Sequence, residues 1–314
     1  MADNRVTVFE VGPRDGLQNE PRPLSLEDRL WFISGLVQAG VKDVEIGAFV
    51  RPDRVPQMAD TERVYAAVDS GKLNLAKARG WALIPNQKGL ERALQCGAKN
   101  LAVFTATSEA FNQRNIGMSV SESLKQIAAL VPAARKASRK GTLIRAYVST
   151  AFGCPFEGKV PPKKTLKVIE SLAKLGVDQI SIGDTIGVAT PKDVDAVIQP
   201  ALKIYGRSEG PKRIAVHFHD TRGTALANTL RALELGVRIV DSSAGGLGGC
   251  PFAPGATGNL ATEDLVFMLD GMGMKTGIDL QLLCKTSLEM AQRMKRPLSS
   301  RYLQAFAAAC DRTL

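Results

Sequence analysis

The chain has 314 residues, 45% of them hydrophobic, which is typical of an ordinary folded protein and long enough for one large α/β domain or two small ones. Its formal net charge of +10 comes from 41 Lys and Arg residues against 31 Asp and Glu, but aromatic residues make up only 5%. Few side chains are therefore available to stack on bases, which argues against a nucleic-acid partner. A phosphorylated small molecule, or general solubility, accounts for the charge equally well.

Cysteine usage and the absence of long apolar runs indicate where the protein works. The five cysteines, at positions 96, 154, 250, 284 and 310, are odd in number, widely spaced and without a Cys-x-x-Cys pair. This pattern predicts free thiols in a reducing compartment. The first residues show neither an apolar signal core nor a transit segment, and no apolar run approaches the thickness of a bilayer. We expect a cytoplasmic protein without a membrane partner.

A short phrase recurs along the chain, and each copy begins with glycine after a helical-looking segment. The copies are Gly40–Gly47, Gly97–Val103, Gly176–Gly183 and Gly236–Val240. The first glycine is expected to cap the preceding helix, and the apolar run after it is expected to form a strand. The phrase therefore predicts repeated helix-to-strand connections.

Further apolar runs complete an alternating series of strands and helices. Additional strands are expected at 5–11, 76–84, 142–148 and 213–218, and helices near 25–39, 60–70, 87–96, 120–138, 163–175, 192–204, 223–235 and 260–271. Eight strands alternating with eight helices indicate an α/β fold in which a parallel sheet closes into a (β/α)₈ TIM barrel. An open doubly wound sheet is the alternative.

The chain shows no linker or low-complexity segment, so we expect a single domain over residues 1–314. It includes a C-terminal helical extension at about 275–314, with amphipathic helices at 279–293 and 299–310 on either side of Pro297. These helices are expected to pack on the barrel or on a partner subunit, which leaves a homo-oligomer open.

Both histidines of the chain lie in one strand, at His217 and His219. Residues two apart in a strand point to the same side, so the two imidazoles are expected to face one space. A pair of structural histidines with satisfied hydrogen bonds is the simpler alternative. The paired spacing favours a metal site over that alternative.

Other polar residues follow different predicted strands, where a barrel of this kind carries its active site. Arg14 and Asp15 follow the first strand, Glu45 interrupts the second, Asp184 ends the sixth, and Asn259 closes the glycine-rich segment after the eighth. Each has a structural explanation taken singly, such as a surface ion pair or a helix cap. Together with the histidines they predict a mixed nitrogen and oxygen site for Mg²⁺, Mn²⁺ or another divalent ion.

The glycine-rich segment 243–259 carries Cys250 near its middle. It lacks the spacing of a dinucleotide-binding loop, and no helix begins directly behind its glycines, so a phosphate cradle is disfavoured. A mobile loop over the substrate is the preferred interpretation. Cys250 is then either a proton donor or acceptor at the site or a small apolar filler.

Six segments carry a resemblance to a known family: Glu10–Glu20, Val55–Asp60, Phe152–Gly158, Gly183–Val188, His217–Thr221 and Gly245–Asp264. Together they resemble the hydroxymethylglutaryl-CoA lyase family, from about residue 5 to about 290. The His-x-His-Asp-Thr and Arg-Asp-Gly elements are shared with a wider superfamily of metal-dependent barrel lyases and synthases. The Gly-Gly-Cys-Pro-Phe-Ala loop resembles the lyase branch in particular.

The resemblance implies a (β/α)₈ barrel that cleaves 3-hydroxy-3-methylglutaryl-CoA, an acyl-CoA, to acetyl-CoA and acetoacetate, as in leucine degradation and ketone body formation. It places Mg²⁺ or Mn²⁺ on Asp15, His217, His219 and Asn259. The remaining roles fall on residues that match the family's motifs. They are Arg14 at the thioester carbonyl, Cys250 and His219 in proton transfer, and Gln18, Asp184 and Glu263 among the substrate contacts, with Glu45, Asp184 and Glu263 also in support of the ligands and the reacting hydroxyl.

Three positions depart from the family pattern. Ala48 and Arg51 stand where the family usually has serines, and Arg222 stands where it often has tyrosine. These changes leave open a lyase for a related 3-hydroxy-3-alkylglutaryl-CoA or another branched hydroxyacyl-CoA. An aldolase or Claisen-type synthase of the superfamily is a further alternative, and a basic nucleotide- or nucleic-acid-binding protein is the non-enzyme alternative.

Overall fold

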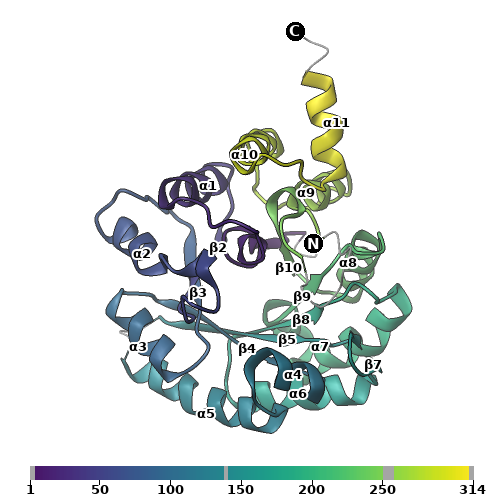
Figure 1. The fold of residues 1–314 in the computed structure, drawn as a ribbon. Helices are drawn as coiled ribbons and strands as arrows, with labels where there is room; N and C mark the ends of the chain where they lie inside the picture. The colour runs from purple at the N-terminus through teal and green to yellow at the C-terminus, as the bar shows by residue number, and fades with distance from the viewer. Residues whose placement is uncertain (1–3, 138–140, 250–257, 311–314) are drawn as a thin grey trace.

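The computed structural model describes residues 4–137, 141–249 and 258–310. Eight parallel strands close into a barrel in the order β1-β10-β9-β8-β5-β4-β3-β2 (Figure 1), which confirms the TIM barrel and excludes the open sheet. The strands are β1 (Thr7–Glu10), β2 (Asp43–Ala48), β3 (Arg79–Leu83), β4 (Asn100–Ala106), β5 (Leu143–Ser149), β8 (Gln179–Asp184), β9 (Ile214–Phe218) and β10 (Ile239–Ser242).

The recurring glycines lie where the helices end. Gly40, Gly97, Gly176 and Gly236 have φ values of +100°, +73°, +75° and +112°, a backbone conformation in which a side chain is strained. The expected capping role of these four glycines is therefore confirmed. Each turns the chain from an outer helix into the next barrel strand.

Helices surround the barrel (Figure 1) and bury the outward faces of the strands. They are α1 (Leu26–Gln38), α2 (Thr61–Asp69), α3 (Gln87–Gln95), α5 (Val120–Ala137), α6 (Pro162–Lys174), α7 (Pro191–Arg213), α8 (Ala225–Leu235) and α9 (Thr262–Gly271). Polar side chains cap several of them. The Ser25 hydroxyl accepts a hydrogen bond from Asp28 N at 3.1 Å, and Asn86 accepts one from Gly89 N at 3.0 Å.

A second apolar cluster lies inside the barrel. Phe9, Trp81, Ala215 and Ile239 come from four different barrel strands and are all buried. The rings of Phe9 and Trp81 meet edge to face with centroids 5.3 Å apart. Because β3 is not adjacent to the other three strands, only the barrel interior can bring these side chains together.

The structure adds segments that the apolar pattern did not predict. Helix α4 (Glu109–Ile116) follows β4, and a short hairpin of β6 (Gly153–Cys154) and β7 (Gly158–Lys159) follows β5. The expected helix ending at 204 instead continues as α7 to Arg213, with a break in its helical backbone at Gly206 (φ +78°).

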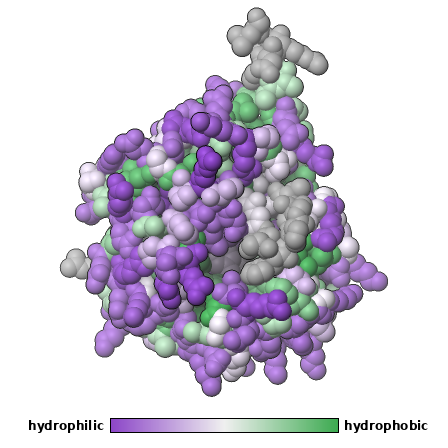
Figure 2. Space-filling view, in the orientation of Figure 1, coloured by the Kyte–Doolittle hydropathy of each residue, from purple (hydrophilic) through white to green (hydrophobic). Residues whose placement is uncertain are grey.

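The C-terminal extension forms α10 (Leu280–Met294) and α11 (Arg301–Cys310), close to the expected bounds. Figure 1 shows α10 beside α1 and α9, with α11 projecting away from the barrel. Figure 2 shows that the face in this view is largely hydrophilic and is hollowed near its middle. Within the described residues, no helix combines the length and the apolar character needed to cross a membrane.

Candidate active site and metal centre

A pocket of about 400 Å³ opens at the carboxyl ends of the barrel strands. Its polar lining includes Arg14 and Asp15 after β1, Tyr147 in β5, and His217 and His219 at the end of β9. Charged and aromatic side chains from distant parts of the chain thus meet in one space, at the face where barrels of this class carry their active sites.

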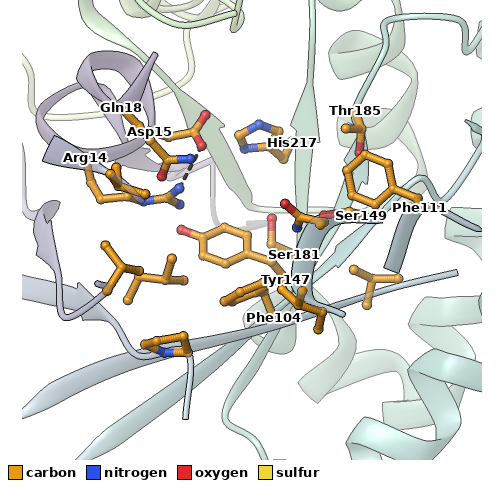
Figure 3. Close-up of a pocket in the computed structure, with 18 of the residues that line it drawn as sticks. Arg14, Asp15, Gln18, Phe104, Phe111, Tyr147, Ser149, Ser181, Thr185 and His217 are labelled. Carbon is orange, nitrogen blue, oxygen red and sulfur yellow. Dashed lines mark hydrogen bonds and ion pairs between the residues drawn. The ribbon is translucent and has the colours of Figure 1, made fainter. Parts of the chain in front are cut away.

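Asp15, His217 and His219 form a compact group of metal-ligating side chains. One ligand atom from each lies within 4.8 Å of the others. Figure 3 shows Asp15 between Arg14 and His217. The two imidazole rings have centroids 5.3 Å apart, so the strand directs both to the same side as expected. This is a candidate site for a cation.

Two buried atoms at this site lack a hydrogen-bond partner among the described residues, namely Asn259 Oδ1 and His219 Nδ1. Asn259 Nδ2 donates to Asp15 Oδ2 at 2.9 Å and to the carbonyl oxygen of Leu247 at 3.0 Å, which leaves its own carbonyl oxygen free. Buried polar atoms are rarely unsatisfied. Two orphaned electron-pair donors beside a carboxylate and a second imidazole fit a bound divalent cation.

The protonation states of His219 and Asp15 also suit a cation. Burial lowers the pKa of His219 to about 4, and the adjacent His217 acts in the same direction. For Asp15 burial acts to raise the pKa, but the charge of Arg14, then that of His217, outweighs it and lowers the pKa to about 2. At neutral pH a neutral imidazole and an ionised carboxylate therefore face one another, which are the metal-binding forms of both groups.

Arg14 is held in place by carboxylates on two elements. Its Nε donates to Glu45 Oε2 at 2.7 Å, its Nη2 lies 2.6 Å from the same oxygen, and its Nη1 donates to Asp15 Oδ1 at 2.7 Å. Tyr147 donates its hydroxyl to Glu45 Oε2 at 3.0 Å, and its ring lies 5.4 Å from the guanidinium carbon of Arg14. Arg14 is thus fixed as a donor at the pocket wall.

The segment that carries Arg14 and Asp15, η1 (Gly12–Gly16), packs tightly against the start of the glycine-rich loop. A Cβ at Gly16 would lie 2.8 Å from Ser243 Oγ and 2.9 Å from Leu247 Cβ, so only glycine fits. Glu10 Oε1 accepts hydrogen bonds from Gly12 N at 2.8 Å and from Ala244 N at 3.0 Å. This buried carboxylate therefore joins η1 to the loop.

Residues 5–289 match the family model described as HMGL-like. Hydroxymethylglutaryl-CoA lyase YngG of Bacillus subtilis is 44% identical over 97% of this chain and 98% of its own length. Human mitochondrial hydroxymethylglutaryl-CoA lyase is 44% identical over 96% of this chain and 89% of its own.

The chain belongs to the HMGL-like family. Solved structures agree with this assignment. The Bacillus subtilis HMG-CoA lyase has a TM-score of 0.90 and 44% identity, covering 97% of this chain and 98% of that one. An Acinetobacter baumannii HMG-CoA lyase in complex with coenzyme A and 3-methylmalate has a TM-score of 0.89 and 35% identity, covering 97% and 96%.

Not all residues expected at the site of this HMGL-like chain reach the pocket. Gln18 lines it together with Arg14 and Asp15. Asp184 is buried and accepts hydrogen bonds from Val188 N at 3.0 Å and Ala189 N at 2.9 Å, so it holds the turn after β8. Its expected role as a substrate contact stays a prediction.

Glu263 is likewise held by hydrogen-bond donors of the protein. Both of its oxygens accept a hydrogen bond from Gly245 N, at 3.0 and 2.8 Å. Glu263 also accepts a hydrogen bond from the hydroxyl of Ser287. Glu263 is fully buried and does not line the pocket. Its carboxylate supports the start of the glycine-rich loop, and its expected role as a substrate contact stays a prediction. Cys250 lies outside the described residues.

Of the positions that depart from the family pattern, Arg222 does not face the pocket. Its Nη1 donates to the carbonyl oxygens of Ile186 at 2.8 Å and Gly187 at 3.0 Å. Arg51 does line the pocket, but it is exposed and paired with Asp53 at 2.6 Å. Arg222 therefore stabilises the turn after β8.

Polar residues inside the strands were missed at the sequence level. Tyr147 and Ser181 line the pocket, and Arg145 and Asp241 form a fully buried ion pair beside His217. The available signal was a charged residue within an apolar strand, as in Leu143–Ser149 and Ile239–Ser242. Glu45 was found by that same signal.

Proposed function

We propose that this protein is a hydroxymethylglutaryl-CoA lyase that cleaves 3-hydroxy-3-methylglutaryl-CoA to acetyl-CoA and acetoacetate with the help of Mg²⁺ or Mn²⁺. The observation that carries the proposal is the convergence of Asp15, His217 and His219 within 4.8 Å, next to a fixed arginine, in a chain 44% identical to curated lyases of this name. A related structure that contains coenzyme A and 3-methylmalate supports an acyl-CoA ligand for the pocket.

The reaction requires the tertiary alcohol to lose its proton while the bond between C2 and C3 breaks. The electrons of that bond move onto the thioester as an enolate, and the alcohol carbon becomes the ketone of acetoacetate. Protonation of the enolate carbon then gives acetyl-CoA. The site must therefore accept one proton, stabilise one developing oxyanion and return one proton.

Arg14 is suited to the developing enolate oxygen. Its three contacts with Glu45 and Asp15 use three of five N–H groups and fix the plane of the guanidinium. One such prepositioned donor typically contributes about 3–4 kcal/mol to the transition state. Glu45 and Tyr147 act by holding Arg14, and Cys250 or His219 is proposed to return the proton.

Asp15, His217, His219 and Asn259 are the residues proposed to hold the divalent ion. Bound there, such an ion would lower the pKa of the substrate alcohol and orient it. Asp15, ionised, and His219, neutral, present the electron pairs that this requires.

The acyl group is the finer part of the proposal. Ala48 is fully buried at the end of β2, and Arg51 and Arg54 lie on the pocket lining. Because residue 48 is small and residues 51 and 54 are cations, a longer 3-hydroxy-3-alkylglutaryl-CoA is the second candidate substrate of the enzyme. A cytoplasmic location and a homo-oligomer remain predictions.

The test is a panel of hydroxyacyl-CoA thioesters, incubated with the purified protein and Mn²⁺ or Mg²⁺, with release of acetyl-CoA and acetoacetate as the readout. We expect turnover of hydroxymethylglutaryl-CoA that stops with chelator. Asp15→Asn should abolish it, while Ser149→Ala, at another residue of the pocket lining, should not. Turnover of only a longer analogue would replace the substrate, and no metal-dependent turnover of any thioester would refute the function.

A further inference from the structure

The carboxylate of Asp241 lies between His217 and a buried arginine. Asp241 Oδ2 lies 3.3 Å from His217 Nδ1 and accepts the hydroxyl of Ser181 at 2.7 Å. Its other oxygen, Oδ1, accepts a hydrogen bond from Nη2 of Arg145. Asp241 and His217 are also direct partners in the register of β10 and β9, so their Cα atoms face one another across the two strands.

Arg145 is fixed more firmly than its ion pair alone would require. Its Nη1 donates to Gln179 at 2.9 Å, and its guanidinium carbon lies 3.8 Å from the centre of the Phe9 ring. Arg145 and Asp241 have no exposed side-chain surface. A buried pair of this kind is weak evidence for stability, since the cost of desolvation offsets the attraction. Its position beside His217 suggests another role.

We propose that Asp241, held by Arg145 and Ser181, is a positioning residue that sets the tautomer and orientation of His217 for the cation. A carboxylate opposite Nδ1 keeps the proton on that nitrogen, so Nε2 presents its electron pair to the site. This inference rests on the metal site of the proposed function.

Asp241→Asn tests this proposal directly, because Arg145 fixes which atom of the new amide faces His217. Arg145 can only donate hydrogen bonds, so the amide oxygen must face it. The amide nitrogen then occupies the place of Oδ2 and donates to His217 Nδ1. In serine proteases, an asparagine in place of the aspartate that faces the catalytic histidine holds that histidine in the wrong tautomer. The variant should therefore move the proton to Nε2 and block the nitrogen that faces the cation.

The first measurement is the tautomer itself. The sequence has only two histidines, so protein labelled with ¹⁵N-histidine gives the nitrogen signals of two imidazoles, and a His219→Gln sample assigns them. In metal-free protein at mildly alkaline pH we expect His217 protonated on Nδ1, and on Nε2 in Asp241→Asn. A wild-type His217 protonated on Nε2 would overturn the proposal, even if the variant does not fold.

The second measurement is Mn²⁺ affinity, by calorimetry on chelator-treated protein. We expect Asp241→Asn to bind Mn²⁺ about 10–100-fold more weakly than wild type. The matched control is Asp43→Asn. Asp43 is a buried barrel carboxylate that accepts from Arg79 at 2.7 and 2.6 Å and from Trp81 Nε1 at 2.8 Å, with no histidine beside it.

Asp43→Asn should keep the wild-type Mn²⁺ affinity despite a comparable loss of stability. Equal weakening in both variants would show general loosening of the barrel and overturn the inference, as would wild-type affinity in a folded Asp241→Asn protein. Neither measurement uses an acyl-CoA. A failed lyase assay therefore leaves the inference standing, and a failed tautomer test leaves the lyase proposal standing.

Discussion

At the scale of single residues, Arg14 combines a fixed geometry with direct access to the pocket. Arg14→Lys keeps the buried positive charge that Glu45 requires but replaces the planar fork by a point charge. We expect kcat to fall on the order of 100-fold or more, the effect of losing one oxyanion donor, with Mn²⁺ affinity within a few-fold of wild type. Steady-state kinetics and a metal titration check both points. Turnover close to wild type would remove Arg14 from the proposed mechanism.

The proposed metal ligands can be tested without substrate. A cation that binds only the folded state raises the melting temperature by mass action, so added Mn²⁺ should stabilise the protein and chelator should reverse the effect. His219→Ala removes one of the three converging side chains and should abolish the Mn²⁺-dependent shift. Ser149→Ala, in the same pocket, should retain it. A full shift in the His219 variant would exclude this residue as a ligand.

At the scale of elements, the C-terminal helix α10 supports the root of the glycine-rich loop. Ser287 on α10 donates to Glu263, which in turn accepts from Gly245 N. The same turn presents the Leu247 carbonyl that orients the Asn259 amide. A helix outside the barrel is thus connected to the candidate metal site through hydrogen bonds at both ends of the turn from Gly245 to Leu247.

Removal of that hydroxyl should therefore affect function as well as stability. Ser287→Ala should cost about 1 kcal/mol. It should also lower kcat by up to about tenfold, because positioned groups tolerate little displacement. Thr286→Ala is the control, since among the described residues the Thr286 hydroxyl donates to Leu282 O of its own helix, at 2.9 Å, and not to the loop. Thermal melts and kinetics should show lower stability in both variants and lower kcat in Ser287→Ala alone. Equal kcat in both would separate α10 from the site.

Local sequence signals predicted most elements and the convergence of polar side chains at the strand ends. Glycine after a helix and an apolar run behind it are local features, and Asp15, His217 and His219 follow from their places at strand ends. The hairpin β6–β7 and helix α4 were missed because they are short and lack a clear apolar period.

The direction of polar side chains within the strands could be predicted only with knowledge of the whole barrel. Whether Arg145, Tyr147 or Asp241 points inward depends on the register of neighbouring strands, which a single segment does not encode. Asp184 and Glu263 show the converse. Both lie near the carboxyl ends of strands, but their carboxylates turn to backbone N–H groups that only the folded loops bring within reach.

At the scale of the whole molecule, the barrel and the extension are joined by charge pairs as well as by buried surface. Arg293 on α10 donates to Asp28 on α1 at 2.5 Å, and Arg296 Nε donates to Glu20 at 3.1 Å.

We propose that residues 1–314 form one domain, with the extension from about residue 275 unfolding together with the barrel. Coincident transitions by far-UV circular dichroism and tryptophan fluorescence would support this, and separate transitions would contradict it.

The stability of the whole protein should also depend on pH through the buried acid Glu10. Burial raises the pKa of Glu10 from 4.5 to about 7, although hydrogen bonds from Thr262, Ala244 and Gly12 oppose the rise. The folded state therefore holds this proton more tightly than the unfolded chain. The resulting contribution to stability is full below about pH 4.5, is lost as the pH rises toward about 7, and is constant above that.

Glu10→Gln removes this titration while Glu263, whose pKa burial also raises to about 7, remains in both proteins. The melting temperature of wild type, compared with that of the variant, should therefore be higher near about pH 5 than near about pH 8. Thermal melts of metal-free protein across that range measure the difference directly. A difference that does not change with pH, or that grows in favour of wild type as the pH rises, would show that Glu10 is ionised in the folded protein throughout. Its hydrogen bonds would then outweigh its burial.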